Sequence, residues 1–84
     1  MIPKEGKVIV DFWAEWCGPC KMMMPVLEKY SAEDDAIEVV KINVDEEPEI
    51  ASEYGIRSIP TFMYIEDGEI VKRQTGSMTI QELK

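Results

Sequence analysis

The sequence predicts an α/β fold, with one mixed sheet of four strands that carries helices on both faces. Two observations lead to this fold class. An apolar run, a helical pattern and a second apolar run follow one another over residues 8–44, which is the strand–helix–strand order of a parallel pair. Two later strand patterns, joined by Asp67-Gly68, predict an antiparallel hairpin that extends the same sheet.

The composition is that of a small globular protein. The chain has 84 residues, of which 45% are hydrophobic and 31% charged, and we expect residues 1–84 to form a single domain of modest stability. No apolar run approaches the length of a membrane span. The net charge of −8, without a basic cluster, argues against nucleic acid and anionic membranes as partners.

The cysteine and histidine content limits the possible chemistry. The first seven residues lack the apolar core of a signal peptide, so we expect a cytoplasmic location. In that reducing compartment two cysteines seldom form a structural crosslink, which favours a cycling dithiol. The absence of histidine excludes His-based acid–base or metal chemistry. A zinc or iron–sulfur site would require two chains, because two thiolates supply half of a four-ligand set.

Residues 8–13 form a short, nearly all-apolar run, which is typical of a central strand buried on both faces. Asp11 interrupts this run. Its side chain either turns to solvent or caps a local turn, or it is a buried carboxylate with a chemical role. The sequence pattern alone leaves both interpretations open.

The stretch Trp16-Cys17-Gly18-Pro19-Cys20 connects this strand to the following helix and holds both cysteines. A C-x-x-C at a strand-to-helix junction indicates a redox dithiol. Cys17 lies where the helix begins, so unpaired backbone N–H groups and the helix dipole favour its thiolate and make it the predicted nucleophile. Cys20 lies one turn later, where the helix and the sheet shield it, and is the predicted resolving thiol. Pro19 suits the first helical turn, and Gly18 leaves room for a partner.

The helical pattern extends over residues 18–30, and Pro25 inside it predicts a kink. Met22 and Met24 lie outside the apolar stripe, either as incidental gap-fillers or as a soft apolar surface beside Cys17. The stripe directed at the sheet consists of Met23, Val26, Leu27 and Tyr30.

A polar connection over residues 31–35 leads to a second strand, residues 37–44. Lys41 interrupts this apolar strand. It is either a solvated lysine of an edge strand or a residue with a special role. The acidic residues around Pro48 predict the start of a short helix, residues 50–54, which Gly55 ends.

Pro60 precedes the next strand, where a proline is suited to a strand start or an edge. The hairpin strands are residues 61–66 and 69–74. A last helix is predicted over residues 79–84, with Ser77 or Thr79 as its cap.

Residues 11–21 resemble the active-site segment of the thioredoxin family. A bare C-x-x-C is a weak signal, whereas Trp-Cys-Gly-Pro-Cys followed about forty residues later by Ile-Pro-Thr is a specific one. The resemblance covers nearly the whole chain from Val8. It continues at residues 41–45, 54–57 and 59–61, at Asp67-Gly68 and at Gly76.

The resemblance implies a minimal thioredoxin fold and the activity of a protein-disulfide reductase. By the same resemblance, Asp11 lies beneath Cys20 and takes its proton, with a pKa that burial raises, and Lys41 approaches Asp11 and tunes it. The Ile59–Pro60 bond is expected to be cis, with the Ile59 backbone open to an extended substrate. The substrate groove would comprise Trp16, Gly18, Pro19, Ile59, Pro60, Thr75 and Gly76.

The implied partners are disulfide-containing proteins and a thioredoxin reductase that uses NADPH or ferredoxin. No bound cofactor is expected, because the Cys17–Cys20 disulfide itself carries the electrons. Three alternatives remain: a glutaredoxin-like enzyme, a disulfide oxidase that uses the same residues at a higher potential, and a non-catalytic accessory subunit with the same fold.

The sequence departs from the family at its start, because thioredoxins usually have a further strand and helix before the strand that here begins at Val8. With Asp11 directed at the helix over residues 18–30, strand alternation places a set of apolar residues on the opposite face, which the missing helix would cover. We expect either weak self-association through this face or through the open edge at residues 39–44, or a monomer of low stability whose N-terminal residues fold back over the face. The set comprises Val8, Val10, Phe12, Val40, Ile42 and Val44.

Overall fold

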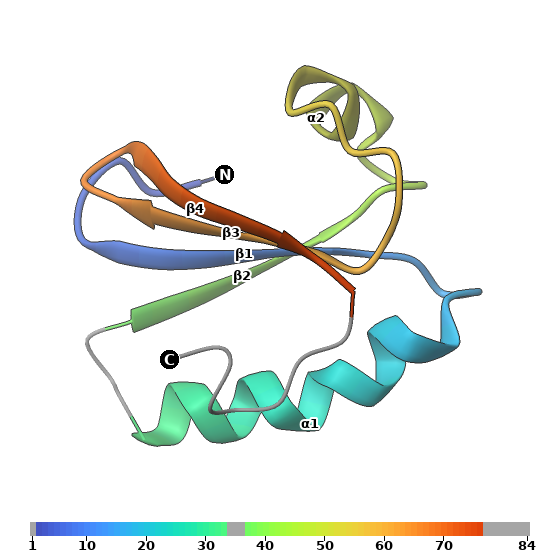
Figure 1. Cartoon of the computed structure of the whole chain (residues 1–84), viewed down its shortest axis with the longest axis horizontal. Coiled ribbons are helices and arrows are strands. Elements are labelled where there is room, and N and C mark those ends of the chain that lie inside the picture. Colours follow the sequence, from blue (N-terminus) through green and yellow to red (C-terminus); the bar gives the residue numbers. More distant parts are fainter. Residues whose placement is uncertain (1, 34–36, 77–84) are drawn as a thin grey trace.

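The computed structural model describes residues 2–33 and 37–76, and it confirms the predicted α/β architecture. The sheet has the strand order β2-β1-β3-β4, in which β1 pairs with β2 in parallel and with β3 antiparallel (Figure 1). The predicted last helix lies outside the described residues. The elements are β1 (Lys7–Trp13), α1 (Gly18–Glu33), β2 (Ile37–Asn43), α2 (Pro48–Glu53), β3 (Thr61–Glu66) and β4 (Glu69–Thr75).

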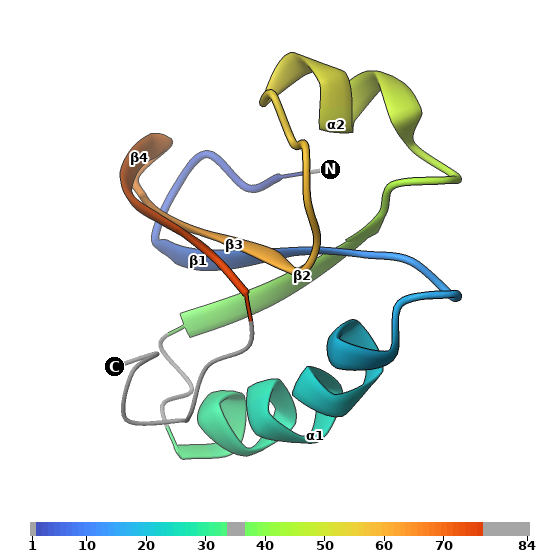
Figure 2. The same ribbon diagram turned by 45° about the vertical axis from the view of Figure 1, so that its right-hand side comes forward.

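The two helices lie on opposite faces of the sheet, as both views show (Figures 1 and 2). Alternation along β1 directs Ile9 towards α1 and its neighbours Val8 and Val10 towards α2. The core between the sheet and α1 contains the predicted helical stripe, with Val26 at its margin. Its buried members are Ile9, Met23, Leu27, Tyr30 and Phe62.

The opposite core lies between the sheet, α2 and the N-terminal residues, and we call it the α2-side core. Its buried members are Val8, Val10, Phe12, Ile42, Met63 and Ile65, so the predicted apolar face exists. Ile2 packs against it, and the Gly6 N–H donates to Asp67 Oδ1 over 2.9 Å. The N-terminal segment therefore lies on the same side of the sheet as α2 (Figure 1). Of the two expectations for this face, folding back of the N-terminal residues is confirmed.

The hairpin between β3 and β4 has the two-residue turn that Asp67-Gly68 predicts. Glu66 pairs with Glu69, and both turn residues have positive φ, 51° at Asp67 and 85° at Gly68. Positive φ at both positions defines the type I′ turn, whose twist matches that of the strands. The hairpin thereby aligns the end of β4 with the start of β3, since Thr75 pairs with Thr61.

The C-terminal ends of both helices differ from the prediction. Helix α1 continues to Glu33, three residues into the predicted polar connection, because Ser31-Ala32-Glu33 contains no helix breaker. Helix α2 begins at Pro48, within the predicted helix start, and ends at Glu53, so that Tyr54 is its C-cap residue and not its last helical residue. In the described part of the chain, no helix is both long and apolar enough to cross a membrane.

Candidate active site

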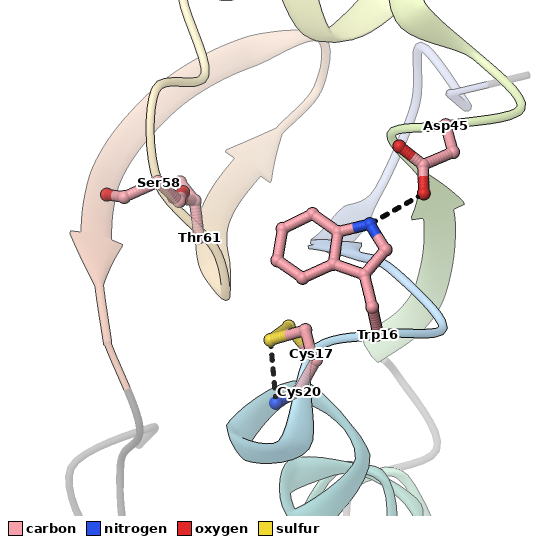
Figure 3. The surroundings of a disulfide bond; sticks show 6 residues. All are labelled: Trp16, Cys17, Cys20, Asp45, Ser58 and Thr61. Atoms are coloured by element: carbon pink, nitrogen blue, oxygen red, sulfur yellow. Dashed lines mark hydrogen bonds between the residues drawn. A yellow bond between two sulfur atoms is a disulfide. The ribbon is translucent and has the colours of Figure 1, made fainter.

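Cys17 and Cys20 form a disulfide at the start of α1, with their Cα atoms 5.3 Å apart. The Cys20 backbone N–H donates to Cys17 Sγ over 3.2 Å (Figure 3). Cys17 immediately precedes the first helical residue and is 5% exposed, whereas Cys20 is fully buried. The sulfur of Cys17 therefore lies where backbone N–H groups of the first turn point, and this stabilises its thiolate when the disulfide opens.

Four segments of the chain meet at this disulfide. Ala14 and both cysteines form a small buried cluster. Partly buried side chains from the end of β1, the end of β2 and the loop before β3 pack against this cluster. That loop ends in the Ile59–Pro60 peptide, which is cis, as the resemblance implied. The Gly76 N–H donates to the Pro60 carbonyl over 2.9 Å, so the end of β4 lies beside the same loop. The packed side chains are Trp13, Val44 and Ile59.

Asp11 is fully buried in β1, on the face that packs against α1. Neither of its carboxylate oxygens has a hydrogen-bond partner in the described structure. Burial raises the pKa of this carboxyl from 3.8 to about 7, and the smaller effect of the Lys41 charge lowers it. The interpretation of Asp11 as a solvent-facing or turn-capping residue is therefore wrong, and its carboxyl exchanges a proton near neutral pH.

Lys41 is the register partner of Asp11 in the parallel β1–β2 pair. Its side chain is exposed and lines a cavity of ≈ 260 Å³ between α1 and β2, together with Leu27 and Val39. Strand β2 lies at one edge of the described sheet. Lys41 is therefore a solvated lysine of an edge strand, and its role in tuning Asp11 stays a prediction.

Trp16 is 70% exposed beside the disulfide, and the hydrogen bond of its indole is a feature that the sequence interpretation missed. The indole N–H donates to Asp45 Oδ2 over 2.8 Å (Figure 3). Asp45 is held in turn, because its backbone N–H donates to Asn43 Oδ1 over 2.9 Å. An Asn two residues before an Asp at a strand end is a signal for a turn, but it does not reveal the distant Trp16.

Comparison with known proteins decides the family. A family model described as Thioredoxin matches residues 1–84. The chain belongs to the thioredoxin family. Thioredoxin from Bacillus subtilis is 53% identical over 73 residues, which cover 86% of this chain and 70% of that protein. Thioredoxin from Rickettsia typhi is 59% identical over 70 residues, which cover 82% of this chain and 67% of that protein.

Solved thioredoxin structures have the same fold. Thioredoxin NaTrxh from Nicotiana alata superposes with a TM-score of 0.88 at 43% identity, covering 94% of this chain and 68% of that one. The oxidised form of mitochondrial thioredoxin 3 from Saccharomyces cerevisiae superposes with a TM-score of 0.87 at 39% identity, and the match covers 94% of this chain and 74% of that one. This chain therefore spans about two thirds to three quarters of the length of these relatives.

Membership of the thioredoxin family defines the activity. The protein is an oxidoreductase that reduces protein disulfides through the Cys17–Cys20 pair, and it uses no bound cofactor. Its substrates are disulfide-containing proteins, and thioredoxin reductase restores its dithiol. Among the described residues, no three His, Cys, Asp or Glu side chains are grouped as metal ligands.

The structure brings most of the predicted site residues to one end of the sheet. Trp16, Gly18 and Pro19 are exposed around the start of α1, and Thr75 is exposed at the end of β4. Pro60 is buried behind Ile59 in the loop that the end of β4 contacts. Lys41 is separate from this group, in the middle of β2 next to Asp11. The predicted residues thus divide into a group around the start of α1 and the end of β4, and the register pair of Asp11 and Lys41 within the sheet.

Proposed function

We propose that Cys17 is the attacking thiol of this reductase, Cys20 the resolving thiol and Asp11 the base that serves Cys20. The single observation that carries this assignment is the asymmetric burial at the helix start. Cys17 keeps 5% of its surface exposed and accepts a backbone N–H at its sulfur, whereas Cys20 is fully buried in α1, on the side of the sheet where Asp11 is buried.

The reaction proceeds in two exchanges of sulfur bonds. The Cys17 thiolate attacks a substrate disulfide, so that a Cys17–substrate bond forms while the substrate S–S bond breaks and one substrate thiolate leaves. Asp11 then takes the proton of Cys20, and the Cys20 thiolate attacks Cys17 Sγ. The intramolecular disulfide forms and the second substrate thiolate leaves. The substrate has gained two electrons and the dithiol has lost them.

Substrate binding is assigned to the surface around Cys17. We assign to it Trp16, Gly18 and Pro19 from the start of α1, together with Ile59, Pro60, Thr75 and Gly76 from the loop before β3 and the end of β4. Ile59 packs directly against the cysteines and is only partly buried, which supports its backbone as the strand-like partner of an extended substrate. Lys41 is assigned to tuning the Asp11 carboxyl, on the strength of its register position.

We further propose a cytoplasmic location and no nucleic-acid or membrane partner, which the acidic composition supports. The reductase that recycles the protein uses NADPH or ferredoxin, and supplying each system in turn to the oxidised protein identifies it.

The test of this function is an insulin disulfide reduction assay combined with the reduction potential of the Cys17–Cys20 pair. We expect reduction of insulin at a strongly reducing potential, near that of thioredoxins, at about −270 mV. Reduction that requires glutathione alone would indicate a glutaredoxin-like enzyme, and a potential as high as about −120 mV would indicate an oxidase. A double Cys-to-Ser variant that kept full biological activity would indicate an accessory subunit.

A further inference from the structure

Arg73 lies in β4 and reaches across to the C-terminus of α2. Its Nη1 donates to the Tyr54 carbonyl over 2.7 Å and its Nη2 to the Gly55 carbonyl over 3.0 Å. Tyr54 is the C-cap residue of α2, and Gly55 follows it with φ of 65°. One guanidinium therefore binds two successive carbonyls through two of its nitrogens, in a fixed planar geometry that the ammonium of a lysine lacks.

Helix α2 is short and has no cation of its own at its end. It has six residues, and no basic residue lies in its last turn. A cation at a helix C-terminus satisfies free carbonyls and opposes the negative end of the helix dipole. Three carbonyls of the last turn already accept backbone bonds, which run from Tyr54, Gly55 and Ile56 to Ile50, Ser52 and Ala51. Arg73 binds two further carbonyls, those of Tyr54 and Gly55.

The segment that follows these carbonyls leads directly to the disulfide. Residues 55–60 connect α2 to β3, and within them Ile59 packs both against the α2-side core and against the buried cysteines. Strand β4 and the residue that follows it hold this segment at both ends. Arg73 of β4 donates to the Gly55 carbonyl, and the Gly76 N–H donates to the Pro60 carbonyl. The backbone bond of Gly76 does not depend on a side chain. The attachment at Gly55 is made by the side chain of Arg73, and nearer Ile59 the Thr61 hydroxyl also donates to the Ser58 carbonyl.

The geometry points to Arg73 as a positioning residue for peptide substrates. By holding the start of residues 55–60, it sets where the Ile59 backbone meets an extended substrate, although it lies on the α2 side of the sheet, away from the sulfurs. This inference rests on the proposed role of Ile59 in substrate binding. A peptide disulfide, which pairs with that backbone, is sensitive to Arg73. A small aromatic disulfide, which needs only the Cys17 thiolate, is not.

The test compares Arg73→Ala and Arg73→Lys with a matched control, Lys72→Ala. Lys72 is the neighbouring exposed residue of β4, and its Nζ lies 5.4 Å from the ring centre of Tyr64. Its substitution removes the same charge without touching α2. We expect Arg73→Ala to raise KM for a peptide disulfide roughly three- to tenfold with kcat within about twofold of wild type. The rate with 5,5′-dithiobis(2-nitrobenzoic acid) should be unchanged, and Arg73→Lys should lie between Arg73→Ala and wild type.

Several outcomes would overturn this role. Arg73→Ala with the KM of the Lys72→Ala control, or with equal losses on both substrates, would show that Arg73 only stabilises the fold. If Arg73→Ala did not fold, Arg73→Lys would decide, since a folded lysine variant with wild-type KM contradicts the need for two hydrogen bonds. A wild-type protein that reduced the small disulfide but no peptide disulfide would overturn the proposed function, and this role with it.

Discussion

Asp11 is a carboxyl group that the fold buries without a hydrogen-bond partner among the described residues. Such a group destabilises the folded protein when it is ionised, because burial removes its hydration. Its pKa of about 7 lies in the range that a base near neutral pH requires. The residue thus opposes folding stability in order to serve the proposed proton transfer, and both effects can be measured on one substitution.

Asp11→Asn should stabilise the oxidised protein and slow the resolution of mixed disulfides by roughly 10²-fold. A pKa raised from 3.8 to about 7 corresponds to at most about 4 kcal/mol of stability lost by the wild type at neutral pH. The folded state holds its proton above pH 3.8 while the unfolded state releases it, so wild-type stability falls between pH 3.8 and about 7. The advantage of the variant should grow over that interval and then level off.

Urea unfolding at a series of pH values measures this advantage, and stopped-flow kinetics measures the resolution rate. A variant less stable than wild type at pH 8 would show that Asp11 is a hydrogen-bonded partner within the fold.

Lys41→Gln should raise the pKa of Asp11 further, because it removes the one charge found to lower it. The effect should be modest, since the lysine is exposed and solvent screens its charge. An NMR titration of the Asp11 side-chain carbon checks it, with Lys29→Gln, an exposed lysine of α1, as the control. The same titration midpoint in all three proteins would leave Lys41 as an edge-strand lysine alone.

At the level of elements, the N-terminal segment is joined to the β3–β4 turn by two hydrogen bonds. The Gly6 N–H donates to Asp67 Oδ1, and the Asp67 N–H donates to the Gly6 carbonyl, each over 2.9 Å. Asp67 has positive φ, which Asn tolerates and Ala does not. This turn therefore controls how firmly Ile2 covers the α2-side core.

Asp67→Ala should lower the free energy of unfolding by about 1–2 kcal/mol, through the lost bond to Gly6 and the strained turn. Asp67→Asn should change it little, since its side-chain oxygen still accepts the Gly6 N–H. Urea titration of both variants, with hydrogen exchange at Gly6, measures the difference. Equal stability of the alanine and asparagine variants would show that the N-terminal segment is held by apolar packing only.

The elements were predictable from sequence where a local pattern defines them. The stripe on α1, the Asp67-Gly68 turn and the alternation along β1 all follow from spacing, and the structure has each of them. The end of α1 was not predictable, because Ser31-Ala32-Glu33 is compatible with helix and with loop.

Contacts between distant segments were not predictable either. Trp16 and Asp45 are 29 residues apart, and Arg73 and Tyr54 are 19 apart. No local spacing relates these pairs, because folding alone brings them together. The Asp11 side chain is an intermediate case, since the sequence left two interpretations and only the packing of α1 decided between them.

At the level of the whole molecule, the N-terminal residues cover the α2-side core, while β2 remains at the edge of the described sheet. An uncovered edge offers unpaired backbone groups to another strand. Lys41 and Glu38 on β2 are exposed charges of the kind that limit such pairing. Self-association of this protein is therefore expected to be weak.

Sedimentation velocity over a hundredfold range of protein concentration should show a monomer that associates weakly at the highest concentrations. Hydrogen exchange should be fast along the outer side of residues 39–44 and should slow as the protein associates. A strict monomer in which these amides are strongly protected at all concentrations would show that another part of the chain pairs with β2.

The central claim is that Cys17 attacks the substrate and Cys20 resolves the intermediate, and the most direct measurement is mass spectrometry of trapped mixed disulfides. Cys20→Ser should accumulate a stable complex linked through Cys17, because the attacking thiol remains and the resolving thiol is absent. Cys17→Ser should lose disulfide reduction and trap nothing, because Cys20 is fully buried. Complexes of Cys17→Ser linked through Cys20, with none formed by Cys20→Ser, would contradict the assignment.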